Sequence, residues 1–415
     1  MRRISSNMAN NDVQYNLRSQ ESRFNKAQNQ MGSQRRIQAL RDDPIAAGHL
    51  VRYESYSKRL NTFEHNAQLI TDNYSVSEGY VNQALQIMHR VRELAVQGAN
   101  GTYTPEDLKN MSTEVDELLK ELILTANATG PDGTSLFSGT RSNTTAFDIV
   151  YGSVEGSGDM LITSVNYNGN VESKNIEVDE GQYLETTSSG NRIFWAEQQA
   201  LYSMRNAGSY IVQEDSIISV DGKQIKLKAG DNVYAIIAKI NDSGAAVKAN
   251  LDPVTNGLTL RTTDSRQLWL EDLNGGNTLN ELGLIKDSGQ RPPNNINPTA
   301  NLSGGSLFDS VIALRDAMLV GDQETIGGRA LGTIDLGISS LTASLAESGA
   351  KFERAEQNLA RISNEILNVN GMISREGDLD ITQAITDLKM LDYVQQATMR
   401  TAAKMYKNTL LDFVR

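Results

Sequence analysis

Side chains with catalytic or metal-binding chemistry are sparse in this 415-residue sequence. The three histidines, His49, His65 and His89, lie in helix-like sequence, and the last two flank an apolar stripe, so we expect them at the surface. There is no HExxH zinc motif, no GxxxxGK[ST] phosphate loop and no GxGxxG after a strand. Cysteine is absent, which excludes disulfides and thiolate metal sites. We therefore expect no enzyme activity, no metal and no cofactor.

Two adjacent carboxylates, Asp42 and Asp43, could in principle do acid-base chemistry, but their surroundings indicate a structural role. In the stretch "ALRDDPIAAGHL", residues 39–50, they precede Pro44 and a run of small residues. The side chain of Asp43 can cap the free N–H groups of a first helical turn, and proline suits the first helical position. We interpret Asp42, Asp43 and Pro44 as a helix-start motif.

Two long heptad patterns must form the main elements of the fold. In 44–98 and again in 331–373, apolar or small residues alternate at spacings of three and four, which is typical of a coiled-coil seam. The seam residues are predicted to be Tyr56, Leu60, Phe63, Ile70, Tyr74, Val81 and Met88 in the first segment and Leu331, Ile338, Leu345, Phe352, Leu359 and Ile366 in the second.

Further helices are predicted at 104–127, where Thr104, Pro105 and Asp107 resemble a capping box, and at 306–319. A heptad stripe cannot bury itself in a monomeric helix. The two ends of the chain should therefore lie side by side, with these shorter helices completing a bundle.

The central part of the chain, residues 141–305, differs in composition and predicts short β-strands. The pair "IISV-DG-KQIKL" carries the Asp-Gly signature of a tight hairpin, and "NVYAIIAKIN" reads as one inserted helix. The proline- and glycine-rich segment 287–305 is expected to be a linker with neither helix nor strand. The predicted fold class is α+β: an elongated antiparallel coiled-coil helical bundle formed by both termini, with a mainly β central domain inserted.

The outermost segments carry only thin apolar stripes. They bury little in an isolated monomer, so we expect residues 1–40 and 380–415 to be largely disordered until neighbouring copies cover them. The stripe residues, which are our candidates for contacts between subunits, are Leu17, Phe24 and Met31 near the start and Leu388, Leu391, Met405, Leu410 and Phe413 near the end.

Charge and hydropathy exclude some partners. The net charge of -12 and pI of about 4.9 argue against nucleic-acid binding, and no apolar run approaches a membrane span. The first 60 residues nevertheless hold eleven Lys and Arg against five Asp and Glu. This basic end is either a solvated helix face or a surface that meets an acidic neighbour. Because the N-terminus lacks the apolar core of a signal peptide, we expect a cytoplasmic protein or one exported by another route.

Several stretches resemble the flagellin superfamily. They are "RDDPIAAG" at 41–48, "VRELAVQGANGTYTPED" at 91–107, "LFSGTRSNTTAF" at 136–147 and the closing run from Asp378 to Arg415. Flagellins typically have Asp-Asp-Ala-Ala-Gly where this chain has Asp-Asp-Pro-Ile-Ala-Ala-Gly. The proline version, with the "MRRIS" opening, looks more like the superfamily members that join hook and filament. The stretch from Ser216 to Leu260 is also similar to an Ile-Asn module inserted in some flagellins, which keeps the filament subunit itself as an alternative.

The resemblance implies a structural adapter of the bacterial flagellum, exported unfolded by the flagellar type III system. It would be extracellular, or periplasmic if the flagellum is internal. The implied partners are further copies in a ring, flagellin, hook-associated protein 1 and an export chaperone, with no nucleic acid and no membrane. The implied domains are 1–43 with 374–415 for polymerisation, 44–140 with 306–373 for the coiled-coil rod, and 141–305 as the outer domain. An exported adhesin or enzyme with its activity in 141–305 is a third, less supported hypothesis.

Overall fold

The computed structural model describes residues 6–130, 133–286, 290–292 and 294–411, with side chains described from 11 to 404 in those ranges. The chain divides into two compact units. The terminal unit comprises Met1–His65 and Ala360–Arg415, and the second unit comprises Asn66–Leu359. Each unit therefore has its own packing, although two long helices, α2 (Pro44–Ala99) and α9 (Leu331–Gly377), contribute residues to both.

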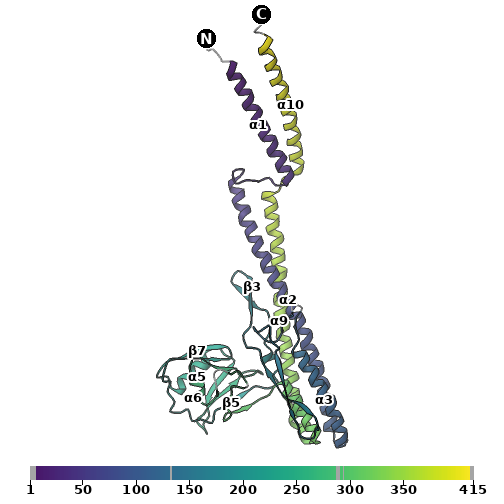
Figure 1. The fold of residues 1–415 in the computed structure, drawn as a ribbon, viewed down its shortest axis with the longest axis vertical. Helices are drawn as coiled ribbons and strands as arrows, with labels where there is room; N and C mark the ends of the chain where they lie inside the picture. The colour runs from purple at the N-terminus through teal and green to yellow at the C-terminus, as the bar shows by residue number, and fades with distance from the viewer. Residues whose placement is uncertain (1–5, 131–132, 287–289, 293, 412–415) are drawn as a thin grey trace. The chain divides into compact units, whose positions relative to one another are not determined.

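The terminal unit contains both outermost segments as helices. Helices α1 (Ser6–Ser33) and α10 (Ile381–Leu411) lie side by side (Figure 1). The expectation that these segments lack structure without neighbouring copies does not match this structure. The physical reason is that α1 and α10 pack against each other, which leaves the described residues of both thin apolar stripes half-buried without a further copy.

The predicted antiparallel pairing of the two heptad segments is confirmed inside each unit. In the terminal unit, the Tyr56 hydroxyl donates to Glu365, and the Ser363 hydroxyl lies 2.8 Å from Glu64. In the second unit, Arg92 Nε lies 2.5 Å from Asp335 Oδ1. Residue numbers rise along one helix as they fall along the other, so α2 and α9 run in opposite directions.

The helical core of the second unit is completed by α3 (Pro105–Ala126) and α7 (Leu307–Val320). Both begin with a capping box, formed by Thr104 with Asp107 and by Ser306 with Asp309. A short α8 (Gln323–Thr325) and a π-helical turn (Ile326–Ala330) lead from α7 into α9. The predicted helices at 104–127 and 306–319 are confirmed.

A β-hairpin and an aromatic cluster share this helical core. Strands β1 (Phe147–Ser153) and β2 (Met160–Tyr167) pair antiparallel, and β2 lies against α7. The rings of Phe147 and Phe308 are 5.0 Å apart, and Phe194 packs against both. A second hairpin, β3 (Asn175–Asp179) and β4 (Gln182–Glu185), and the short α4 (Gly190–Ile193) follow. Residue 141 is therefore not a boundary between cores, because the core crosses it. The three-part division remains a prediction about the assembled state.

Residues 198–303, here called the β module, form a separate core. One sheet has the order β10-β6-β7 and another the order β11-β5-β9-β8. The elements are β5 (Ala200–Tyr202), β6 (Ser216–Val220), β7 (Lys223–Leu227), α5 (Val233–Asp242), β8 (Val247–Leu251), β9 (Leu258–Thr262), β10 (Leu270–Leu273), α6 (Thr278–Glu281) and β11 (Asn301–Ser303).

Two predictions about the β module had different outcomes. The Asp-Gly hairpin is confirmed: β6 and β7 pair across Asp221 and Gly222, whose φ angles are 51° and 75°. The expectation that 287–305 contains no strand is wrong at its end. There β11 pairs with β5, because the chain must leave the module beside the strand on which it enters.

Candidate assembly surface

Two connecting segments in the terminal unit are fastened to each other. We call them the clasp: residues 34–43, between α1 and α2, and residues 376–380, which comprise the end of α9 and the connection to α10. The Arg36 amide donates to Gly377 O at 2.8 Å, and the Leu379 amide donates to Gln34 O at 3.0 Å. The Arg36 guanidinium also donates to Glu376 O at 2.8 Å. The clasp thus ties together the two points at which the chain enters and leaves the α1/α10 pair.

The predicted helix-start motif is part of the clasp. Asp43 Oδ1 accepts the Ala46 amide at 3.1 Å, and Pro44 is the first residue of α2. That hydrogen bond holds the pKa of Asp43 below its ordinary value. This capping role agrees with the sequence interpretation.

Asp42 does not cap the helix but organises the connecting segment before it. Its carboxylate accepts the Lys26 ammonium at 2.7 Å and the amides of Gln38 and Ala39 at 3.2 and 3.1 Å. These donors, Lys26 foremost, lower the pKa of Asp42 to about 2. The neighbouring carboxylates therefore have separate partners and separate tasks, and their surroundings favour the charged form of each rather than a shared proton.

The predicted subunit-contact residues lie on the paired helices α1 and α10 of the terminal unit. All five whose side chains are described are half-buried: Leu17, Phe24, Met31, Leu388 and Leu391. The side chains of Met405 and Leu410, and all of Phe413, lie outside the described residues. Their role in contacts between copies remains a prediction.

Other apolar side chains on the same helices are exposed, and sequence reasoning missed them. On α10, Tyr393 is 76% and Met390 is 66% exposed, and Met399 is also open to solvent. Tyr15 is exposed on α1. Their only sequence signal was that large apolar residues occur off the predicted stripe. Exposed side chains of this size are available to a partner without unpacking α1 from α10.

The predicted coiled-coil seam is buried, though unequally. On α2, Leu60, Ile70, Tyr74, Val81 and Met88 are buried, and Tyr56 and Phe63 are half-buried. The six positions named on α9 are all half-buried: Leu331, Ile338, Leu345, Phe352, Leu359 and Ile366. The other heptad position of α9 is the fully buried one: Ile334, Leu341, Ser348, Ala355, Ile362 and Val369. On α9 the fully buried heptad position therefore lies three residues further along the chain than the named one, and the role of these residues as a coiled-coil seam remains a prediction.

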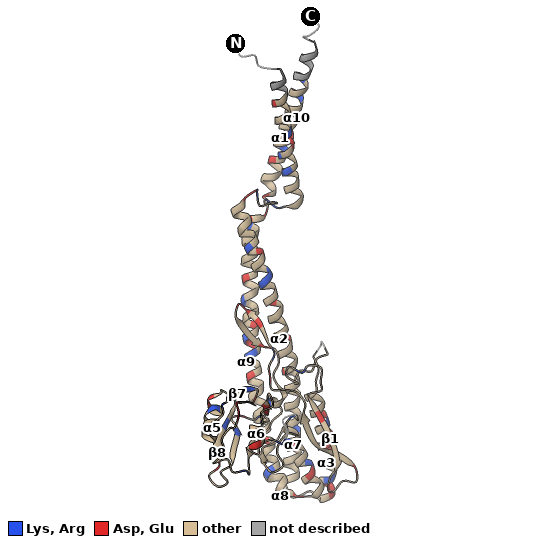
Figure 2. Cartoon of the chain, turned by 60° about the vertical axis from the view of Figure 1, so that its left-hand side comes forward, with Lys and Arg blue, Asp and Glu red and all other residues tan. Residues whose placement is uncertain are grey.

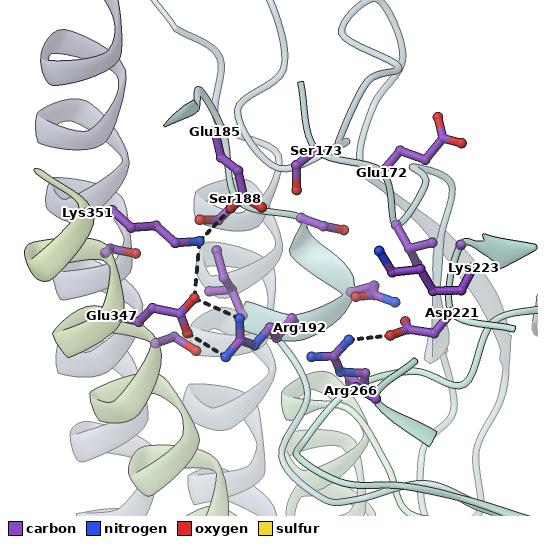
Figure 3. A pocket seen from close by; sticks show the side chains of 18 of the residues that line it. Glu172, Ser173, Glu185, Ser188, Arg192, Asp221, Lys223, Arg266, Glu347 and Lys351 are labelled. Atoms are coloured by element: carbon purple, nitrogen blue, oxygen red, sulfur yellow. Dashed lines mark hydrogen bonds and ion pairs between the residues drawn. The ribbon is translucent and has the colours of Figure 1, made fainter. Parts of the chain in front are cut away.

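The described residues offer no evident reactive centre. His65 and His89 are exposed, and His49 Nδ1 lies 3.8 Å from Glu376. No group of three metal-ligating side chains occurs within the described ranges. A cleft of about 590 Å³ in the second unit is lined by paired charges, including Arg192 with Glu347 (Figure 3). Three of its basic side chains, Arg192, Arg266 and Lys351, are paired with acids.

The two units differ in charge. The terminal unit has 18 Lys and Arg against 13 Asp and Glu, whereas the second unit has 21 against 38. Acidic side chains are prominent on α3, for example Glu114 and Glu117 (Figure 2). Opposite net charges on two parts of one chain favour contacts between the basic part of one copy and the acidic part of another. None of the helices in the described part of the chain has the length and apolar character needed to cross a bilayer.

Two family models match the chain. Residues 4–142 match the bacterial flagellin N-terminal helical region, which spans α1, α2, α3 and the clasp segment between α1 and α2. Residues 214–264 match the flagellin hook IN motif, which spans β6 to β9 of the β module. The two matches thus fall on the helical part and on the inserted part of the fold separately.

Known proteins align with nearly the whole chain. Flagellin A of Vibrio cholerae is 23% identical over 418 residues, which covers 99% of each chain. Among solved structures, flagellar hook associated protein-3 from Legionella pneumophila is 15% identical with a TM-score of 0.45, covering 78% of this chain and 97% of that one. A putative flagellar hook-associated protein from Vibrio parahaemolyticus is 14% identical with a TM-score of 0.47, covering 81% and 100%.

The fold is α+β, with paired helices from both ends of the chain and a β-rich insertion. With both family matches and a relative that aligns over the full length, the chain is similar to bacterial flagellins.

Proposed function

We propose that this protein is the adapter that joins the hook-associated layer of the flagellum to the flagellin filament. The observation that carries the proposal is the exposed apolar face of α10, centred on Tyr393 and Met390, on a helix pair formed by both chain ends. A structural monomer gains nothing by exposing such side chains, whereas a subunit packed in a ring buries them against its neighbours.

The proline helix start at Asp43-Pro44 favours the adapter over the filament subunit, because it departs from the flagellin pattern in the way described above. The match to the flagellin hook IN motif in the β module does not separate the adapter from the filament subunit, because the sequence of this module also resembles an insert of some flagellins. In this role the protein acts without catalysis. Each contact along α10 contributes little binding energy, but many such contacts in a closed ring together bind strongly.

The partners and the route follow from this role. Copies of the chain form the ring, hook-associated protein 1 lies on the hook side, and flagellin adds on the other side. An export chaperone covers the terminal segments before the chain passes unfolded through the flagellar type III system. A chain without cysteine cannot be trapped by disulfides on that route.

The filament subunit itself is a second candidate, because flagellins of Vibrio cholerae align with the chain from end to end. Two measurements separate the candidates. Purified adapter should not extend filament seeds by itself, whereas a filament subunit should. Quantitative immunoblotting of isolated flagella should find a sparse layer of adapter, and a copy number matching the main filament protein would reject the proposal.

The surface itself is tested by the double substitution Tyr393→Asp with Met390→Asp in the chromosomal gene. Both side chains are exposed, so the fold should persist, but the charges should prevent packing in the ring. We expect cells with hooks, no filaments and flagellin released into the medium. Tyr234→Asp, the same change at an exposed tyrosine of α5, is the control and should leave filaments normal. Normal filaments on the double variant would contradict the proposed surface.

A further inference from the structure

The second unit contains two hydrophobic cores that are separate from each other. One belongs to the helical body, which we define as residues 66–197 and 304–359, and the other to the β module. The chain passes between them only twice, near residues 198 and 303. Something other than these two connections must set the orientation of the module.

A single strand segment carries apolar side chains into both cores. Leu268 and Leu270 are buried in the core of the β module, whereas Trp269 is buried in the core of the helical body. Successive side chains of an extended chain point in opposite directions, which explains this alternation. The Trp269 indole lies 6.3 Å from the ring of Tyr167, edge to face. Trp269 is thus the side chain by which the module enters the aromatic cluster of the body.

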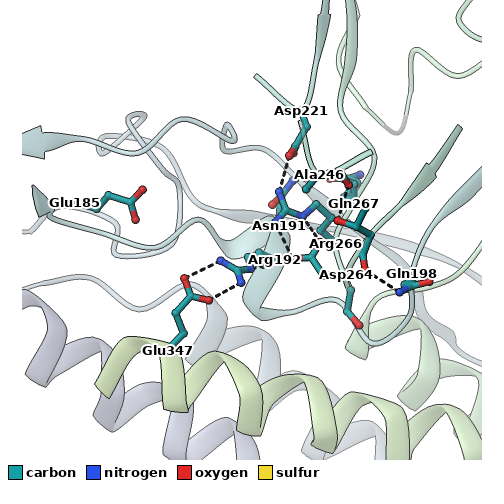
Figure 4. A network of polar contacts seen from close by, with 12 residues as sticks. Glu185, Asn191, Arg192, Gln198, Asp221, Ala246, Asp264, Arg266, Gln267 and Glu347 are labelled. Atoms are coloured by element: carbon teal, nitrogen blue, oxygen red, sulfur yellow. Dashed lines mark hydrogen bonds and ion pairs between the residues drawn. The ribbon is translucent and has the colours of Figure 1, made fainter. Parts of the chain in front are cut away.

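Polar contacts fasten the same segment to the body. The Gln267 amide donates to Asn191 O at 3.1 Å, and Asn191 Nδ2 donates back to Gln267 O at 3.2 Å. The Ser265 hydroxyl donates to Ala196 O at 3.2 Å. These reciprocal bonds hold residues 264–269 along α4 and the chain that follows it (Figure 4).

Beside the cleft of about 590 Å³ described above, one ion pair joins the helical body to the β module. Arg192 holds Glu347 of α9 through both terminal nitrogens, at 2.9 and 2.5 Å, and its Nε lies 3.4 Å from Asp264. Asp264 in turn holds Arg266, which reaches Asp221 in the hairpin turn at 2.5 Å. Figure 4 shows this chain of alternating charges running from α9 to the β module. Only the step from Arg192 to Asp264 crosses from body to module.

We propose that residues 264–269 are a docking segment that fixes the orientation of the β module on the helical body, with Trp269 as its anchor and Arg192–Asp264 as an ionic latch. Both groups of the latch are more than a third exposed, so salt screens it and the anchor dominates. When the latch is screened, the module tilts about the anchor and opens the cleft. This inference does not depend on the proposed place in the flagellum.

The natural absence of cysteine allows a direct test on the full chain. Cysteines introduced by Asn110→Cys on α3 and Lys226→Cys on β7, both exposed positions, carry spin labels. Pulsed electron paramagnetic resonance then measures the distribution of distances between body and module. The parent should give one narrow distribution in low salt and a wider one in high salt, and a broad distribution in low salt would overturn the proposal.

Substitutions in this labelled chain separate anchor from latch. Trp269→Ala should at least double the width of the distribution, and Trp269→Phe should largely restore it. Asp264→Asn should widen it less and remove its response to salt. Asp242→Asn, the same change at an exposed site on α5, is the control and should have no effect.

Folding of each variant is checked by circular dichroism and by the fluorescence of Trp195, which remains in the body core. A folded Trp269→Ala variant with the narrow parental distribution would refute the anchor. If Trp269→Ala fails to fold, Trp269→Phe still tests the anchor and the response of the distance distribution to salt still tests the latch. An Asp264→Asn chain whose distance distribution responds to salt like that of the parent would refute the latch.

Discussion

A buried ion pair between α3 and α7 makes a strong prediction about the second unit. The side chain of Arg315 is fully enclosed and that of Asp116 is 9% exposed, and their Nη1 and Oδ1 atoms are 2.9 Å apart. Arg315 also donates to the Ile162 carbonyl of β2 at 2.7 Å and to Asp316 at 2.7 Å. One guanidinium therefore connects α3, α7 and the β1/β2 hairpin.

Removing the acid should cost far more than removing the pair. Asp116→Ala leaves a buried cation, a change that typically destabilises by about 3–5 kcal/mol. We expect the lower end, about 3 kcal/mol, because Asp316 still holds the guanidinium. That is about a 150-fold change in the unfolding equilibrium. Combining Asp116→Leu with Arg315→Met should be within about 1 kcal/mol of the parent, because apolar residues can replace a buried pair at little cost.

Urea unfolding followed by tryptophan fluorescence measures these effects. Both tryptophans, Trp195 and Trp269, are buried in the second unit, so the signal reports on that unit. Glu114→Ala is the matched control: Glu114 lies on the same helix and pairs with Arg90 at 2.7 Å, but both side chains are exposed. It should cost no more than about 1 kcal/mol. An Asp116→Ala variant as stable as this control, or a double variant as unstable as Asp116→Ala, would refute the argument.

Three further outcomes are expected. Asp43→Ala should lower the stability of the terminal unit, seen in denaturation followed by circular dichroism, because α2 loses its N-cap. The pKa of Asp42 in the folded protein is about 2, below the ordinary 3.8. The stabilisation from its contacts should therefore be complete above pH 4 and lost as the pH falls from about 4 through 2. Hydrogen exchange of the amides of residues 34–43 should become faster only within this pH range. Gly337→Ala should destabilise the protein by about 1–3 kcal/mol in thermal unfolding, because the new Cβ would lie 2.5 Å from Leu307 Cδ2. Gly349→Ala, where nothing lies near the new Cβ, is the control and should be neutral or stabilising. Equal effects of the two substitutions would contradict the packing at Gly337.

The sequence alone predicted the helices α2, α3, α7 and α9 and the pairing of α2 with α9, but it did not predict α1 and α10 as ordered helices. Heptad spacing is a local property that survives any tertiary arrangement, so the seam and its antiparallel partner could be read directly. The same holds for Asp43-Pro44 and for the Asp-Gly turn at 221–222, where backbone geometry restricts the residue types. The heptad spacing, the helix start and the turn each depend on residues that are only a few positions apart in the sequence.

Only the tertiary structure decided which surfaces are buried. Spacing could not show that α9 centres on Ile334 and Leu341, that Gly337 is packed while Gly349 is open, or that Asp42 holds the clasp. Nor could it show that Trp269 points away from its neighbours into a different core, because no local pattern distinguishes one buried strand residue from the next. Burial depends on segments far apart in the chain meeting at one place, and a single sequence specifies those meetings only through the folded structure.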